Sequence, residues 1–177
     1  MEGEHRWTER DIQLALWRSF GKKSVIVMPN FCPTMWEECD VWRVLESRLA
    51  VEYEVKVSRA DYSRERSSKP SKMYAMEKRN VYSPSYFYYV CQTGLLQAKD
   101  MPEWAGLIEC DWVDGHPGFA ATRIVRRRAP KRHSRQATPE DIERARTGSV
   151  CRMWRLMGNG HEVPHEEIAA GDRTVAE

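Results

Sequence analysis

Residues 49–57 of this 177-residue chain constrain its fold more than any other segment, because apolar and charged side chains alternate along them. Successive side chains of a β-strand point to opposite faces, so this alternation is typical of a strand with one apolar and one charged face. The charged face carries Glu52, Glu54 and Lys56. The segment therefore predicts a strand that places two carboxylates and an ammonium group in one row.

The rest of the chain predicts helices before and after a group of strands. Thr8 and Asp11 have the spacing of a capping box before a helix that ends at Gly21, and Thr138 precedes a second helix that reaches Met157. Residues 58–80 are polar, basic and interrupted by Pro70, so we expect a partly mobile connection with a helical piece at 72–79. Further strands are predicted at residues 25–28, 39–45, 86–91, 105–110 and 123–128.

This order of elements predicts an α/β fold with a central mixed β-sheet flanked by helices. The first two strands, at 25–28 and 39–45, are expected to pair as a hairpin. We expect a single domain over residues 1–157, and the composition from Gly158 onward predicts a flexible C-terminal tail over residues 158–177. No apolar run reaches the roughly 18 residues of a membrane span, and no cysteine pair has the C-x-x-C spacing of a zinc ribbon. A cytoplasmic protein with free thiols and no membrane partner is expected.

Basic residues gather in two stretches, although the net charge of the whole chain is only +2. The first, at 59–79, follows the charged strand directly, and the second occupies 123–135. Such patches can contact phosphates, but a basic edge strand also serves to prevent aggregation. The candidate nucleic-acid contacts are Lys69, Lys72, Arg79, Arg126, Arg127 and Arg128.

The residues that predict chemistry lie on two neighbouring strands. Asp40, with Glu38 two residues before it, belongs to the strand that precedes Glu54-Val55-Lys56. Carboxylate oxygens are the ligands that Mg²⁺ prefers, usually one or two of them together with water and substrate phosphate. Asp40 and Glu54 would supply such a pair, and Lys56 follows Glu54 on the same face. A divalent ion and a neighbouring ammonium group together suit phosphodiester hydrolysis.

An acid on one strand followed by an E-x-K triplet on the next resembles the PD-(D/E)XK, or restriction-endonuclease-like, nucleases. The surroundings, over roughly residues 8–130, are similar to the small MmcB-type proteins linked to DNA repair and to their phage relatives. The quoted segments are Thr8 to Ile12, Glu52 to Tyr62, Phe87 to Val90 and Pro102 to Ile108. Cys39 stands where the family name has proline, and Glu38 competes with Asp40 as the ligand, so Glu38, Asp40 or both remain candidates.

The resemblance implies a restriction-endonuclease-like core and a nuclease that depends on Mg²⁺ or Mn²⁺, with Glu9 as an acid of the first helix that joins the metal site. The expected substrate is DNA, with RNA left open, and a homodimer or a protein partner also remains open. Two alternatives belong to other classes. One is a catalytically silent nucleic-acid-binding protein on the same fold, and the other is a phage-type accessory protein that binds a host protein.

The tryptophans, Trp17 and Trp154 among them, could stack on nucleic-acid bases, but at strand and helix positions we expect them in the core.

Overall fold

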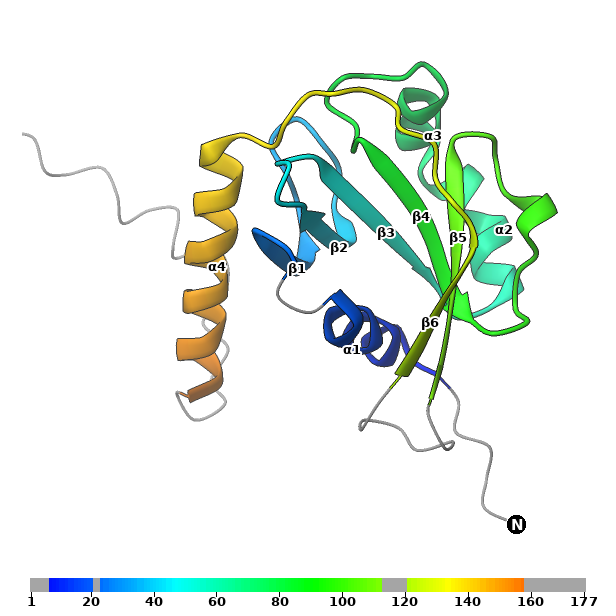
Figure 1. The fold of residues 1–177 in the computed structure, drawn as a ribbon, viewed down its shortest axis with the longest axis horizontal. Helices are drawn as coiled ribbons and strands as arrows, with labels where there is room; N and C mark the ends of the chain where they lie inside the picture. Colours follow the sequence, from blue (N-terminus) through cyan, green and yellow to red (C-terminus); the bar gives the residue numbers. More distant parts are fainter. Residues whose placement is uncertain (1–6, 21–22, 113–120, 158–177) are drawn as a thin grey trace, which may run out of the picture.

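The computed structural model describes residues 7–20, 23–112 and 121–157, which form one sheet with helices on both sides (Figure 1). Among these described residues, the first helix is α1 (Glu9–Phe20) and the last is α4 (Pro139–Met157). The strands and helices between them are β1 (Ile26–Phe31), β2 (Cys39–Val44), β3 (Ala50–Lys56), α2 (Arg59–Ser68), α3 (Pro70–Glu77), β4 (Tyr86–Gln92), the short 3₁₀ helix η1 (Ala98–Asp100), β5 (Ala105–Trp112) and β6 (Ala121–Arg127).

The six strands lie side by side in chain order, from β1 at one edge to β6 at the other. Strands β1, β2 and β3 form an antiparallel meander, β3, β4 and β5 are parallel, and β6 returns antiparallel to β5. The mixed sheet confirms the predicted α/β class, and the predicted β1–β2 hairpin is present. Helices α2 and α3 form the connection that a parallel β3–β4 pair requires.

Side-chain caps fix where three of the helices begin. The Asp11 N–H donates to Thr8 Oγ1 at 3.3 Å, and the Thr8 N–H donates back to the Asp11 carboxylate at 2.9 Å, as the capping box predicts. Thr138 caps α4 in the same way, with its Oγ1 accepting from a backbone N–H at 3.1 Å. Ser58 caps α2 by accepting from the Asp61 N–H at 3.1 Å.

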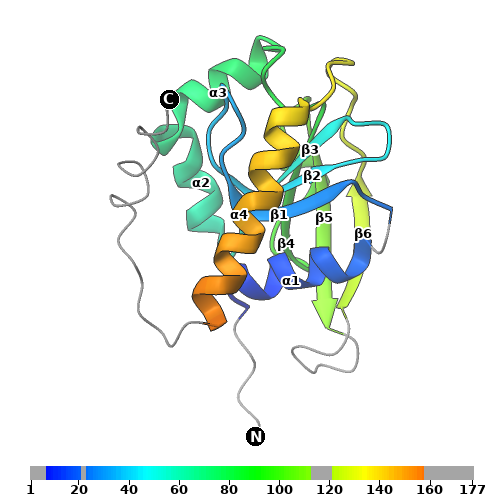
Figure 2. The same ribbon diagram turned by 90° about the vertical axis from the view of Figure 1, so that its left-hand side faces the viewer.

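The two faces of the sheet have different covers (Figures 1 and 2). Helix α1 buries Ile12 and Leu16 against the apolar face of β3, which carries Val51, Tyr53 and Val55. The opposite face of the central strands lies under α2 and α3, where Met76 joins a second apolar cluster. Helix α4 packs over β1 and β2. The charged row of β3 therefore points into the layer between the sheet and α2–α3.

The predicted elements need correction at α2 and at β1. Residues 59–68 form a complete helix, α2, where a partly mobile connection was expected, because Ser58 caps it and Glu65 is buried beneath it. Pro29 lies inside β1 rather than closing it. Its position is tolerated because β1 is an edge strand, where a missing N–H need not break a ladder.

The predicted tail, residues 158–177, lies outside the described residues. Within the described ranges, no helix has both the length and the apolar character that crossing a bilayer requires. The five cysteines all belong to the described part, and each is a free thiol as expected.

Candidate metal and catalytic site

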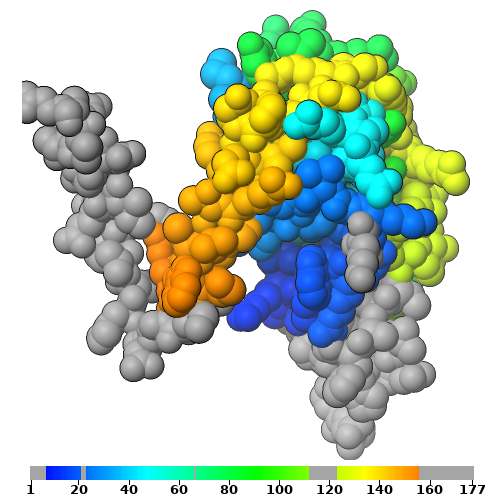
Figure 3. Space-filling model, turned by 60° about the vertical axis from the view of Figure 1, so that its left-hand side comes forward, coloured from blue at the N-terminus to red at the C-terminus, as the bar shows by residue number. Residues whose placement is uncertain are grey.

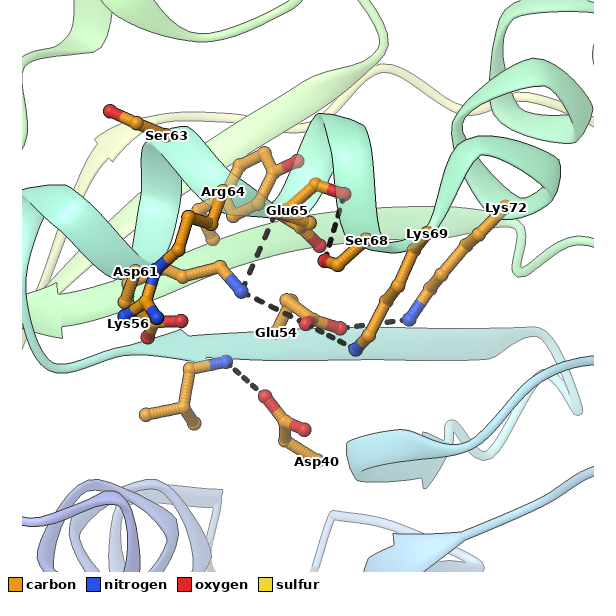
Figure 4. A network of polar contacts seen from close by, with 12 residues as sticks. Asp40, Glu54, Lys56, Asp61, Ser63, Arg64, Glu65, Ser68, Lys69 and Lys72 are labelled. Carbon is orange, nitrogen blue, oxygen red and sulfur yellow. Dashed lines mark hydrogen bonds and ion pairs between the residues drawn. The ribbon is translucent and has the colours of Figure 1, made fainter.

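The site begins where strands β2 and β3 separate. Their ladder pairs Val41 with Tyr53, and beyond that pair the backbone N–H of Val55 donates to the Asp40 carboxylate instead, at 2.7 Å (Figure 4). The side chain of Asp40 thus takes the place of a backbone acceptor. This bond holds one carboxylate oxygen and brings Asp40 beside Glu54 on the next strand.

Glu54 lies at the centre of a cluster of ammonium groups and is only 1 % exposed. Its Oε1 lies 3.0 Å from Lys56 Nζ and 2.7 Å from Lys69 Nζ, and its Oε2 lies 2.8 Å from Lys72 Nζ. Burial alone would raise the pKa of Glu54, but the lysines, Lys72 foremost, hold this pKa far below its ordinary value. Glu54 is therefore a permanent carboxylate at any physiological pH.

The pKa of Asp40 shifts in the opposite direction to that of Glu54. Burial, and after it the negative charge of Glu54, raises the pKa of Asp40 to about 7, although the Val55 N–H opposes this shift. Glu9 adds a smaller repulsion in the same direction. Two neighbouring carboxylates with pKa values pushed apart are typical of functional sites. A cation that binds between them would relieve the repulsion that raises the Asp40 pKa.

Lys56 is held between two carboxylates from different elements. Its Nζ lies 3.0 Å from Glu54 Oε1 on β3 and 3.5 Å from Glu65 Oε2 on α2. Burial would lower the pKa of Lys56, but Glu54 and Glu65 outweigh it and raise this pKa above its ordinary value. Lys56 is therefore a fixed ammonium group, available for hydrogen bonding and charge stabilisation.

These side chains surround one open pocket, which the predicted site residues Glu9, Asp40, Glu54 and Lys56 all line. The helix α2 supplies the opposite wall, with residues spaced at i, i+3, i+4 and i+7, so that they share one face of the helix. The wall residues of α2 are Asp61, Arg64, Glu65 and Ser68. Sequence reasoning missed these four, although their spacing on one helical face is readable from the sequence.

The carboxylate oxygens around the pocket are of the chemical type that a hard divalent cation prefers. Asp40 Oδ2 accepts a hydrogen bond from the Val55 N–H. The carboxylates of Glu54 and of the exposed Glu9 line the same pocket as Asp40. In residues 7–20, 23–112 and 121–157, no group of three or more His, Cys, Asp or Glu side chains is placed to hold a metal ion by itself. Magnesium sites commonly use only one or two protein carboxylates and complete the octahedron with water and substrate phosphate.

Lys72 was expected to contact nucleic acid, and the structure shows that this expectation is wrong. Its side chain is fully buried beneath α3, where its ammonium group pairs with both Glu52 and Glu54. Burial would lower the pKa of Lys72, but these two carboxylates raise it well above the ordinary value. Lys72 neutralises the charged face of β3 from inside the protein and cannot reach a phosphate.

The other predicted contacts are dispersed. Lys69 lines the pocket with about a third of its side chain exposed. Glu38 is exposed just before β2 and does not line the pocket. Arg79 is exposed at the end of α3. The second basic group lies on and after β6, which β4 and β5 separate from β3. There Arg126 pairs with Glu109, Arg127 donates to carbonyls near η1, and Arg128 is exposed.

Comparison with known proteins supports the fold alone. No protein-family model matches the chain, and no curated protein sequence matches it. The solved structure of SPO1766, a protein of unknown function from Silicibacter pomeroyi, superposes with a TM-score of 0.59 at 16 % sequence identity. The match covers 89 % of this chain and 97 % of that one. The chain is therefore similar in fold to SPO1766 over nearly the whole of both proteins.

Proposed function

We propose that this protein is a divalent-metal-dependent nuclease that hydrolyses DNA phosphodiester bonds. One observation carries the proposal: Asp40, Glu54 and Lys56, which come from two strands, line the same pocket together with Glu9 of α1. The sequence resemblance to PD-(D/E)XK nucleases selects these residues independently of the fold. An acid on the second strand, an E-x-K triplet on the third and a helical connection to a parallel fourth strand fit that resemblance.

Asp40 and Glu54 would hold the cation, with Glu9 able to approach it from the helix side of the pocket. A divalent cation at this place would lower the pKa of a bound water and neutralise charge on the phosphoryl oxygens. Lys56 donates hydrogen bonds from a fixed position, which orients the attacking water and offsets negative charge as it develops. Lys69, at the mouth of the pocket, would attract the phosphate backbone.

The test is cleavage of plasmid and single-stranded DNA by the purified protein with Mg²⁺ or Mn²⁺, and with EDTA as the metal-free control. We expect cleavage only with the metal, and its loss in Asp40→Asn, which keeps the size of the side chain and its hydrogen bond from Val55. Cleavage that persists in EDTA, or in Asp40→Asn at the normal rate, would contradict the assignment.

One feature favours a second candidate, a nucleic-acid-binding protein that does not cut. Both carboxylate oxygens of Glu54 already contact ammonium groups of Lys56, Lys69 and Lys72, so its charge is compensated without a metal ion. Binding of DNA in EDTA, together with no cleavage under any metal condition and no stabilisation of the protein by Mg²⁺ or Mn²⁺, would establish this candidate.

A further inference from the structure

A second hollow lies beside the candidate site, between α1, β1 and the C-terminal half of α4. Figure 3 shows it between the blue α1 and the orange end of α4. Its surface is mainly apolar, with Leu14, Val27, Met28 and Met153 among the lining residues. We call this hollow the α1–α4 groove. Apolar surface that a folded protein leaves open to solvent is often a binding site.

An exposed aromatic side chain lines the groove, and a second belongs to the residue that follows one of the lining residues. Trp17 of α1 lines it and is 60 % exposed, and Trp154 follows the lining residue Met153 on α4 and is 63 % exposed. Both tryptophans were expected in the core, so the structure corrects that expectation. An exposed indole face costs solvation free energy in the absence of a ligand, and it offers a stacking surface for a nucleic-acid base.

The charged groups that line the groove are both cationic. Arg10 is exposed on α1, and Arg152 reaches across from α4 to donate to the carbonyls of Pro29 at 2.8 Å and Asn30 at 2.9 Å. A guanidinium has five N–H donors, so these two bonds fix Arg152 and leave three donors for a phosphate. The groove thus combines an apolar floor with positive charge and suits a ligand that has flat apolar groups and a negative backbone.

The groove and the pocket lie next to each other, with Gln13 between them. Arg10 and Val41 line the groove, whereas Glu9 and Asp40, one residue before each, line the pocket. Gln13 lines the groove and donates from Nε2 to Glu9 Oε1 at 2.9 Å and to the Asp40 carbonyl at 3.0 Å. A strand lying in the groove would therefore pass close to the carboxylates.

We infer that the α1–α4 groove binds an unpaired strand of nucleic acid, with a base stacked on Trp17 and phosphates near Arg10 and Arg152. The inference rests on the proposed function, because it gives the same pocket its substrate class. A duplex presents phosphates and sugars on its outside, whereas an unpaired strand exposes base faces that match the apolar floor. The protein would accordingly prefer single-stranded substrates, or junctions with an unpaired arm, to blunt duplexes.

The test is fluorescence anisotropy with a labelled oligothymidylate and the full chain in EDTA, so that binding is measured without cleavage. Trp17→Ala should weaken binding about tenfold or more, the effect of removing one stacked base. The matched control is Tyr74→Ala, which removes an aromatic of α3 that is 62 % exposed and does not line the groove. This control should bind like the unchanged protein, and a blunt duplex of the same length should bind more weakly than the single strand.

A second measurement examines the charge of the groove. Arg10→Ala should lower the slope of log Kd against log salt by roughly 0.7, the value for one phosphate contact on a single strand.

Equal losses in Trp17→Ala and Tyr74→Ala, or no loss in either, would overturn the inference. It would also be overturned if Trp17→Ala left DNA binding unchanged but dissolved a dimer seen by sedimentation, because the groove would then hold a second copy of the chain. The two proposals fail separately. If binding depends on Trp17 but no metal-dependent cleavage occurs, the proposed nuclease function is wrong. If cleavage occurs but binding does not depend on Trp17, the proposed role of the groove is wrong.

Discussion

Lys72 Nζ lies 2.8 Å from Glu54 Oε2, and both side chains are buried between the sheet and α3. The same ammonium group pairs with Glu52, so one lysine compensates two carboxylates of the β3 charged row. A charge that is buried without its partner costs far more than the pair itself contributes. Glu54, one of the two acids that would hold a metal, therefore depends in part on this lysine for its place in the fold.

We predict that Lys72→Met lowers the free energy of unfolding by about 3–5 kcal/mol, because it removes the cation that pairs with buried Glu52 and one of the three that contact buried Glu54. Urea denaturation measures the change. The control Lys78→Met, at an exposed position at the end of α3, should change stability by less than about 0.5 kcal/mol. Adding Glu52→Gln to Lys72→Met should restore part of the loss, since the buried charge that Lys72 compensated at Glu52 is then removed. A Lys72→Met protein as stable as the unchanged chain would contradict this role.

The titration of Glu65 predicts how stability depends on pH. Burial, followed by repulsion from Glu54, raises the pKa of Glu65 to about 7 from the ordinary 4.5. Between these values the folded chain retains a proton that the unfolded chain has lost, so this group lowers stability as pH rises from about 4.5 to about 7. Across this pH range, the contribution of Glu65 should lower the free energy of unfolding by at most about 3 kcal/mol. In Glu65→Gln this contribution to the pH dependence should be absent. An identical pH profile for the two proteins would refute the assignment.

The raised pKa of Asp40 predicts that metal binding is stronger at higher pH. A cation binds the deprotonated carboxylate, so it competes with the proton that Asp40 retains up to about pH 7. Millimolar Mg²⁺ or Mn²⁺ should raise the Tm by a few degrees at pH 8, and less at pH 5.5. Asp40→Asn should abolish the increase at both pH values, and a shift that survives in this variant would place the cation elsewhere.

Much of the fold could be predicted because the strands carry regular patterns. The alternation in 49–57 predicted β3, and the positions of Asp40, Glu54 and Lys56 on adjacent strands followed from it. Helix α2 was missed because the side chain that it buries toward the sheet is Glu65, so its inner face shows no apolar periodicity. The cap at Ser58 and Asp61 was the signal that could have found it.

The burial of Lys72 could not be predicted from the sequence for a related reason. Its partners Glu52 and Glu54 come from a strand far earlier in the chain, and a lysine in a basic stretch looks like a surface residue until the packing of α3 is known. The exposure of Trp17 likewise depends on how α4 lies relative to α1. Local patterns predict elements well, whereas the partner of a charged or aromatic side chain is set by tertiary contacts.

Single-turnover DNA cleavage by Glu54→Gln and Glu52→Gln would show whether Glu54 is the metal-binding acid. Both acids lie on the same face of β3, both are buried and both contact Lys72, but Glu54 alone of the two lines the pocket. We expect that Glu54→Gln lowers the cleavage rate by about 10³-fold or more, whereas Glu52→Gln stays within about tenfold of the unchanged protein. Equal rates for the two variants, with both folded, would contradict the assignment of Glu54 as the metal-binding acid.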